Sequence, residues 1–229
     1  MFYFDPTYFW YIFIPTILIS LGVQIFMKRS FSKWGAVPNS RHVSGYQTTQ
    51  VMFNRTSLSP IPVETVPGTL SDHYDPGENV VRLSNGVSRG ESVASMAVAA
   101  QELGHVQQDQ TGSGLIKMRG FLLPALRFST TLSYIALLLG FFFNLTGVFW
   151  VGSLLFALMV LFSLLTLPVE LNASKRALAM LDETGLRQTE EDIKGSKAVL
   201  RAAAMTYLAA AVTSVLQLLY YISIAQRRS

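Results

Sequence analysis

The chain has 229 residues, of which half are hydrophobic and only 14% are charged, a balance typical of membrane proteins and not of soluble domains. It contains no cysteine, which excludes disulfides, thiolate nucleophiles and cysteine-based zinc sites. The net charge is +4, but basic residues beside apolar segments serve membrane topology, so we expect no nucleic-acid partner.

The first apolar segment covers residues 8–27 and carries no charge. About 20 such residues are needed to cross a bilayer. Lys28 and Arg29 follow it where a signal peptide would have a small-residue cleavage site, so we interpret it as a retained membrane anchor.

The polar segment 30–118 is expected to lie outside the bilayer. Within it, residues 45–57 predict a short helix, and Pro60, Pro62 and Pro67 then break regular structure. Residues 69–84 alternate around a Pro-Gly-Glu-Asn turn and predict a β-hairpin. One hairpin is not stable alone in water, so the helix expected after Ser92, a good N-cap, should cover it.

That helix carries the sequence Gln101-Glu102-Leu103-Gly104-His105. Residues four apart lie on one helix face, so Gln101 and His105 point to a common place with Glu102 beside them. This is the geometry of the H-E-x-x-H helix of zinc peptidases, in which two residues hold the metal and the Glu acts on its water. Here the first metal-ligand position is a Gln. Its neutral amide oxygen is a poorer zinc ligand than imidazole, so we expect weakened metal binding.

Three further spans are expected, at residues 121–143, 148–168 and 199–225. Arg119 and Arg127 lie near the start of the second span. A second site-bearing segment, residues 170–197, begins with Glu170, where the third span leaves the bilayer, and its helix should stop at Gly185.

Charge distribution indicates the orientation. If the segment after the first span is cytoplasmic, every Lys and Arg except Arg227 and Arg228 lies on that side, as the positive-inside rule favours. The motif helix and Glu170 then share the cytoplasmic face. The expected fold class is mainly α: an integral, multi-pass membrane protein with about four transmembrane helices. It would carry a small cytoplasmic α/β-hairpin metalloprotease-like domain, with 1–229 as a single domain in a bacterial-type plasma membrane.

Several sequence blocks in order and spacing carry a family resemblance. They are FDPTY before the first span, PGTLSDHYDP followed by VVRLS, VAVAAQELGH, and LPVELNASKRAL followed by KAVLRAAAMTYLAAAV. Together they resemble the YugP-like membrane zinc metallopeptidases over nearly the whole length. The resemblance implies zinc as cofactor, with His105 and Glu170 as ligands and Glu102 as general base. The first ligand position of the family falls on Gln101, which departs from the family pattern.

Alternatives stay open for these residues. Glu102 could instead pair with an arginine such as Arg82, and Gln101 could coordinate the metal or hydrogen-bond to Glu102 or Glu170, of which we favour the hydrogen bond. His73 or Asp72 could replace the missing imidazole, although a role in holding the hairpin is favoured.

Two functions follow from this reading. One is proteolysis of membrane or misfolded proteins at the cytoplasmic face, with peptide or protein substrates. The other is a pseudoenzyme, a pseudopeptidase that serves as a structural or assembly subunit for partner membrane proteins. Because only Gln101 separates them, enzyme status is left undecided from the sequence.

Overall fold

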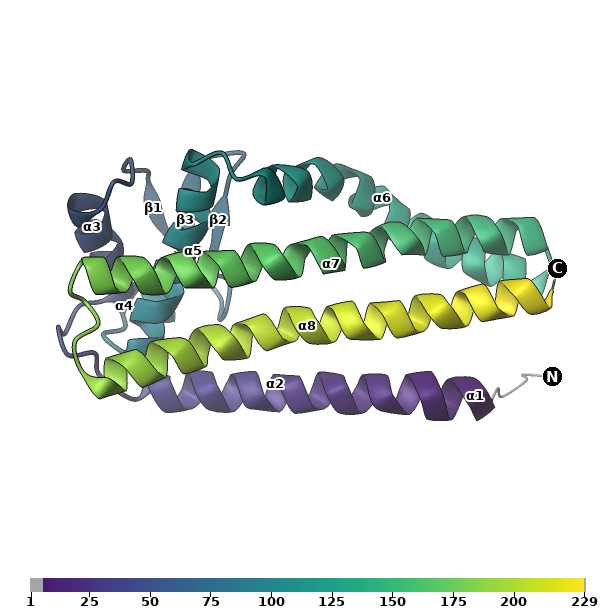
Figure 1. Ribbon diagram of the computed structural model, residues 1–229, viewed down its shortest axis with the longest axis horizontal. Coiled ribbons are helices and arrows are strands. Elements are labelled where there is room, and N and C mark those ends of the chain that lie inside the picture. Colours follow the sequence, from purple (N-terminus) through teal and green to yellow (C-terminus); the bar gives the residue numbers. More distant parts are fainter. Residues whose placement is uncertain (1–5, 229) are drawn as a thin grey trace. The chain divides into compact units, whose positions relative to one another are not determined.

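A computed structural model describes residues 6–228. Residues 1–5, which include Phe4 and Asp5 of the FDPTY block, and Ser229 lie outside the described residues, as do the side chains of Leu115, Arg119 and Arg127. The described chain is mainly helical with one small sheet, as expected (Figure 1).

The elements follow one another along the chain in the colours of Figure 1. The helices are α1 (Pro6–Tyr8), a π-helical turn η1 (Phe9–Phe13), α2 (Ile14–Gly35), α3 (Gly45–Arg55), α4 (Asn85–Arg89), α5 (Val93–Gln110), α6 (Gly114–Phe142), α7 (Thr146–Glu183) and α8 (Glu190–Arg227). The strands are β1 (Val63–Val66), β2 (His73–Asp75) and β3 (Val80–Ser84).

Contacts divide the chain into two compact units. The described residues of unit 1 come from Met1–Gln24, Lys117–Pro168 and Thr206–Ser229, and unit 2 comprises Ile25–Ile116 and Val169–Met205. All four residues of the expected site, Gln101, Glu102, His105 and Glu170, belong to unit 2. The single-domain organisation expected from the sequence stays a prediction.

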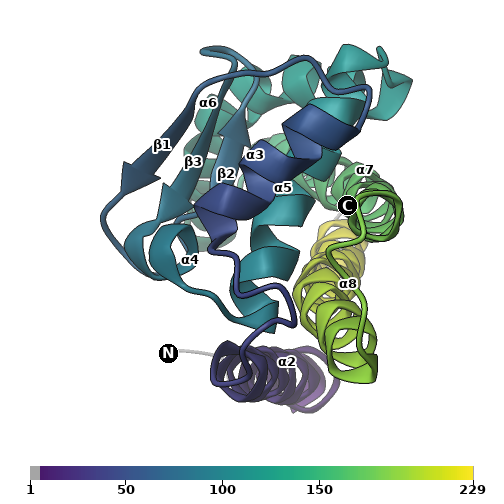
Figure 2. The ribbon, with the colours of Figure 1, turned by 90° about the vertical axis from the view of Figure 1, so that its left-hand side faces the viewer.

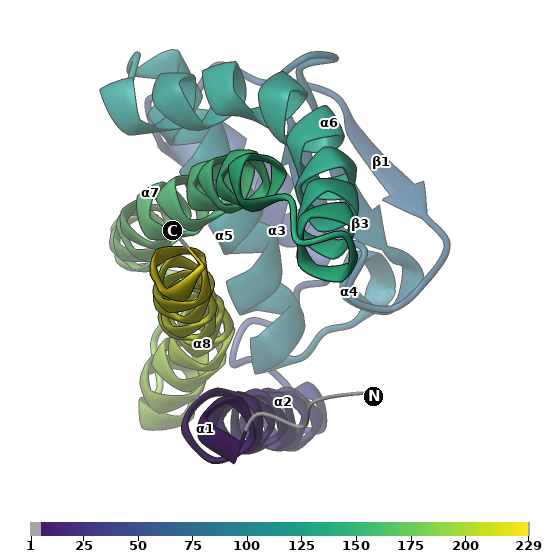
Figure 3. The same ribbon diagram turned by 90° about the vertical axis from the view of Figure 1, so that its right-hand side faces the viewer.

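Unit 1 is built from apolar helices. α6 and α7 form a hairpin through a short turn in which Asn144 has a left-handed φ of 54°, and Figure 3 views the structure from this end. The two helices touch where glycine lacks a side chain: a Cβ on Gly140 would lie 2.5 Å from the backbone nitrogen of Phe149. Ser133 adds a hydrogen bond to the backbone oxygen of Gly152.

Among the described residues, three helical segments are long and apolar enough to cross a membrane: Pro6–Gly35, Thr146–Glu183 and Glu190–Arg227. Two parts of α6, Ile116–Leu126 and Phe128–Phe142, meet at 48° and would together make a fourth. The expected number of about four is therefore reached only if this bent pair counts as one span.

Unit 2 contains a three-stranded sheet in the order β1-β3-β2. The predicted hairpin is present as β2 and β3, antiparallel, with Tyr74 opposite Val81. β1 was not predicted and pairs parallel to β3. Its four residues lie between Pro62 and Pro67, which flank the strand without entering it. The two prolines thus mark the ends of a strand in a region where we expected irregular chain. Figure 2 shows the three strands with α3 and α5 on one side of them.

The core of unit 2 is formed around α5, whose small residues Ala94, Ala97, Ala99 and Ala100 are fully buried. Ser92 caps this helix as predicted, because its side chain accepts a hydrogen bond from the backbone of Ser95. The predicted short helix is α3. α7 is one helix that passes Pro168 without ending, and Gly185, with φ of 66°, follows its last turn near the predicted stop.

Candidate metal centre

The structure brings α5 and α7 together at His105 and Glu170. The Nε2 atom of His105 lies 3.3 Å from Oε2 of Glu170, and both side chains are buried. These residues are 65 positions apart in the sequence, and their proximity was the central spatial prediction. It is found in the structure, whereas their roles as metal ligands stay predictions.

Gly104, next to His105, makes this approach sterically possible. A Cβ atom at this position would lie 2.4 Å from the backbone oxygen of Ala173 on α7. Real Cβ contacts are not this short, so any side chain would push α7 away from α5. The glycine inside the motif therefore sets the spacing of the two helices beside the site.

Gln101 reaches the same carboxylate. Its Nε2 atom lies 3.4 Å from both Oε2 and the backbone oxygen of Glu170, so it donates long hydrogen bonds there. This is the hydrogen-bonding arrangement that the sequence analysis favoured for Gln101. Its Oε1 atom is buried and accepts no hydrogen bond from the described part of the chain. An unsatisfied buried oxygen costs about 1–3 kcal/mol, so a partner for it would be stabilising.

Glu102 is buried beside the other three residues. Burial raises the pKa of its carboxyl from 4.5 to about 7; the charge of His105 opposes this shift, while those of Glu170 and Asp72 add to it. The backbone of Tyr74, on strand β2, also hydrogen-bonds to the Glu102 carboxyl and lowers the pKa. A carboxyl with a pKa near neutrality is suited to taking up and releasing a proton.

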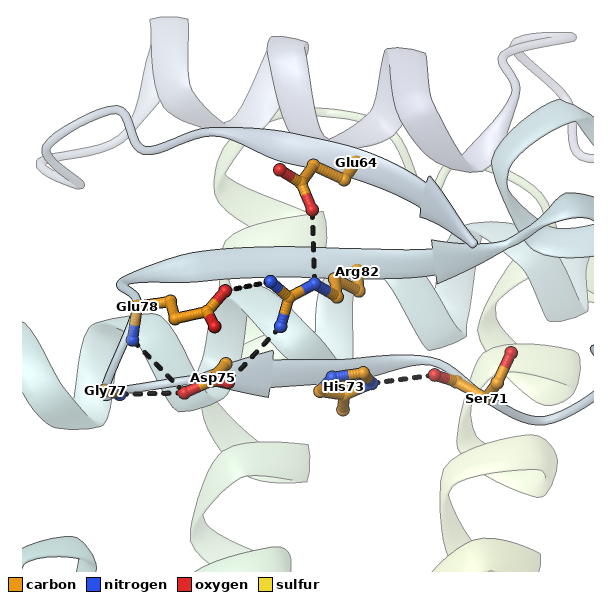
Figure 4. A network of polar contacts seen from close by, with 7 residues as sticks. All are labelled: Glu64, Ser71, His73, Asp75, Gly77, Glu78 and Arg82. Atoms are coloured by element: carbon orange, nitrogen blue, oxygen red, sulfur yellow. Dashed lines mark hydrogen bonds and ion pairs between the residues drawn. The ribbon is translucent and has the colours of Figure 1, made fainter. Parts of the chain in front are cut away.

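Arg82 does not pair with Glu102. It lies on the outer face of the sheet, where it contacts Glu64, Asp75 and Glu78 (Figure 4). The alternative reading of Glu102 as the partner of Arg82 is therefore wrong.

His73 and Asp72 also take structural positions. His73 is exposed on the outer face of the sheet, and its Nδ1 lies 2.8 Å from the backbone oxygen of Ser71 (Figure 4). Its neighbour Tyr74 points the opposite way, toward α5, since adjacent strand residues alternate. Asp72 accepts hydrogen bonds from the backbone and hydroxyl of Ser84, the nearer at 2.7 Å. Asp72 thus joins the two arms of the hairpin, whereas the contact of His73 is with a residue two positions earlier, so its role in holding the hairpin stays a prediction.

Gln108 is a residue of the site that sequence reasoning missed. It is fully buried, and its Oε1 lies 3.1 Å from Nδ1 of His105. The sequence analysis gave it no role, although it stands three residues after His105 and hence on the same helix face. Asn172 and Arg176, one turn apart on α7, continue the polar contacts from Gln108.

The donor atoms fit a divalent metal with one weak ligand. Within residues 6–228, no group of three His, Asp or Glu side chains is placed to hold an ion, and Gln101 is a neighbouring amide that could add a third donor. Two ligands of a tetrahedral zinc ion lie roughly 3.3 Å apart. The separations from Glu170 Oε2, 3.3 Å to His105 and 3.4 Å to the Gln101 amide, have this size. Rotation of that amide would present its unsatisfied oxygen.

Comparison with known proteins decides the family. A family model described as "Putative neutral zinc metallopeptidase" matches residues 9–226. The chain belongs to this family. A relative from Bacillus subtilis (strain 168), named "Putative membrane protease YugP", is 37% identical over 212 residues, which cover 92% of this chain and 93% of the relative. No solved structure matches the chain.

Membership of the metallopeptidase family and the apolar helices together identify a membrane protein of the zinc metallopeptidase class. The resemblance seen in the sequence blocks is thereby confirmed. The family description implies zinc.

Proposed function

We propose that the chain is an integral-membrane metallopeptidase that hydrolyses peptide bonds of membrane or misfolded proteins at the cytoplasmic face, with a weakened metal site. The observation that carries the proposal is the buried pair of His105 and Glu170, 3.3 Å apart, with Glu102 beside it. Burial of two such groups is unfavourable unless they hold a positive charge between them.

His105 and Glu170 would bind the metal directly, and Gln101 would add its amide oxygen. When bound, zinc polarises the scissile carbonyl and lowers the pKa of its water. Glu102, whose carboxyl has a pKa of about 7, would take up a proton from a water molecule at this place and give it to the leaving amine. The hydrogen bond from Tyr74 orients the Glu102 carboxyl while it does so.

Strand β2 supports an extended peptide substrate. It is an edge strand of the sheet, and Tyr74 at its centre lies against the motif helix, to which its hydroxyl donates a 2.8 Å hydrogen bond at Asp109. An extended chain adding to this edge would run past Glu102. The cytoplasmic location rests on the charge asymmetry of the sequence.

A second candidate, a catalytically inactive pseudopeptidase in a larger membrane complex, is favoured by one contact. The Gln101 amide donates a hydrogen bond to the Glu170 carboxylate. This bond gives the carboxylate a partner when no metal is bound. In that case the chain would act as a non-catalytic subunit that binds partner membrane proteins.

The experiment that separates them is a cleavage assay with casein on the purified full chain. We compare the unaltered protein with Gln101→His and Glu102→Gln, each incubated with zinc. Slow cleavage by the unaltered chain, faster cleavage by Gln101→His and none by Glu102→Gln would support the peptidase. Cleavage only by Gln101→His would support the pseudopeptidase. Full cleavage by Glu102→Gln would contradict the assigned general base.

A further inference from the structure

Four polar side chains form a continuous path from the surface of α7 to the metal centre. Arg176 contacts Asn172, Asn172 contacts Gln108, and Gln108 contacts His105. The path leads to the ring nitrogen of His105 that faces away from Glu170. Each contact in it fixes which atom is a donor and which is an acceptor.

The orientation of Asn172 is set by Arg176. The Nε atom of Arg176 lies 2.8 Å from Oδ1 of Asn172, and a guanidinium group only donates hydrogen bonds. The Asn172 atom at that position must therefore be the oxygen. A second guanidinium nitrogen of Arg176 donates to Oε1 of Gln107 at 3.1 Å, which holds the guanidinium in place.

The orientation of Gln108 follows. Its Nε2 lies 2.9 Å from Oδ1 of Asn172 and 2.8 Å from the backbone oxygen of Val169, and both of these atoms only accept. The amide nitrogen must face them, and the amide oxygen must face His105. Gln108 has no exposed surface, so rotating its amide would leave buried donors and acceptors unmatched.

We propose that Gln108 is a positioning residue that keeps a proton on Nδ1 of His105 and so leaves the Nε2 lone pair directed at Glu170. The amide oxygen of Gln108, 3.1 Å from Nδ1, accepts only from a protonated nitrogen. A neutral imidazole then has its lone pair on Nε2, which is the form that binds a metal.

This arrangement also explains why the pair needs a cation. The Nε2 lone pair and the Glu170 carboxylate oxygen are both acceptors, 3.3 Å apart. Two facing acceptors repel unless a proton or a metal ion lies between them. This role of Gln108 rests on the proposed function, because it matters only if His105 binds a metal. The test measures the position of a proton and not cleavage, so it can fail while the proposed function holds, and the reverse.

The test is nitrogen-15 NMR of the full chain in detergent micelles, with only histidine labelled. The chain has three histidines, and His42→Gln and His73→Gln variants assign the ring signals by elimination. Spectra are recorded in the presence of a chelator, above the pH at which the ring carries two protons. We expect His105 to carry its proton on Nδ1. A proton on Nε2, with Nδ1 bare, would overturn the proposal.

Two matched variants then test whether Gln108 is the cause. Gln108→Met removes the acceptor at nearly constant volume and should lower the ratio of the Nδ1-protonated to the Nε2-protonated form about fivefold, the usual effect of losing one hydrogen bond. Gln107→Met, the same change at the preceding residue, loses one contact with Arg176 but keeps the bond from Arg176 Nε to Asn172, so it should leave the ratio nearly unchanged. An unchanged ratio in Gln108→Met would refute the role of Gln108.

A further variant guards against misfolding of Gln108→Met. Asn172→Leu removes one of the two acceptors that orient the Gln108 amide and leaves Gln108 itself intact. It should shift the ratio in the same direction by a smaller factor. If the ratio is insensitive to Asn172→Leu and Gln108→Met alike, another group holds the proton of His105.

Discussion

Gly104 lies so close to Ala173 that a Cβ atom on the glycine would be 2.4 Å from the alanine's backbone oxygen. The contact joins α5 to α7 beside the two residues of the candidate metal centre, His105 and Glu170. It makes the spacing of His105 and Glu170 depend on a residue that has no side chain.

Gly104→Ala should therefore disturb both stability and metal binding. Overpacking of this kind costs about 1–3 kcal/mol in unfolding free energy, and the displaced α7 carries Glu170 away from His105. We expect a lower Tm and weaker zinc binding by titration calorimetry. The control is Gly86→Ala in the same unit, where a Cβ meets nothing within 4 Å. Equal effects of the two changes would contradict the close-contact explanation.

Gln101→His should raise the zinc content. In the unaltered chain the amide replaces an imidazole, so we expect much less than one zinc ion per purified chain, measured by elemental analysis. The added imidazole should raise affinity at least about tenfold, since even an outer-shell partner of a ligand contributes that much. Gln107→His, which adds an imidazole outside the donor set, serves as the control. One full zinc ion per unaltered chain would show that a donor other than Gln101 completes the site.

Asp192 gives a pH-dependent contribution to stability. Burial by itself would raise the pKa of this carboxyl, but hydrogen bonds from Ser40, Thr189 and Gln188 outweigh it and hold the pKa below 3.8. The unfolded chain thus binds the proton more readily, so the contribution is present above pH of about 4 and is lost as the pH falls through the folded pKa.

Asp192→Asn tests this. It should lower the unfolding free energy by about 1–2 kcal/mol at pH 7, the usual effect of removing such a helix-capping carboxylate. The difference from the unaltered chain should shrink below pH of about 4. Glu190→Gln, at an exposed carboxyl in the same helix turn, is the control. A difference that is constant from pH 7 to pH 3 would show that the charge of Asp192 does not matter.

The proposed cytoplasmic location of the candidate metal centre can be tested by labelling, because the chain has no cysteine of its own. Ser57→Cys lies in the unit that holds the site, and Leu145→Cys lies in the turn between α6 and α7; both positions are exposed. With a membrane-impermeant maleimide on intact cells, we expect labelling of Leu145→Cys and protection of Ser57→Cys until the cells are opened. The reverse pattern would place the centre outside.

Local sequence signals predicted the elements that depend on near neighbours. Ser92 predicted the start of α5, and the Pro-Gly-Glu-Asn turn predicted the hairpin, because helix caps and turns are determined by residues a few positions away. The meeting of His105 with Glu170 was predicted from the membrane topology together with the family's blocks. The sequence therefore predicted those parts of unit 2 whose structure is determined by helix caps, by turns or by the order of the sequence blocks.

The features that the sequence did not predict depend on residues far away along the chain. β1 is four residues long, and only its pairing with β3 makes it a strand. Gln108 reads as an ordinary polar residue at the end of a helix, and its contacts with Val169 and Asn172, 61 and 64 positions away, give it a role. The contact of Arg82 with Glu64 likewise depends on the pairing of β3 with β1, while Asp75 and Glu78 come from the hairpin itself.

The path from Arg176 to His105 has a consequence for how relatives of this chain should be compared. The five-residue motif on α5, residues 101–105 in this chain, is the usual basis for deciding whether a member of the family keeps both histidines. By the role proposed for Gln108, exchanging that residue would weaken the preference for a proton on Nδ1 even in a chain with both histidines in place. The residues that contact the motif should therefore be compared together with the motif itself.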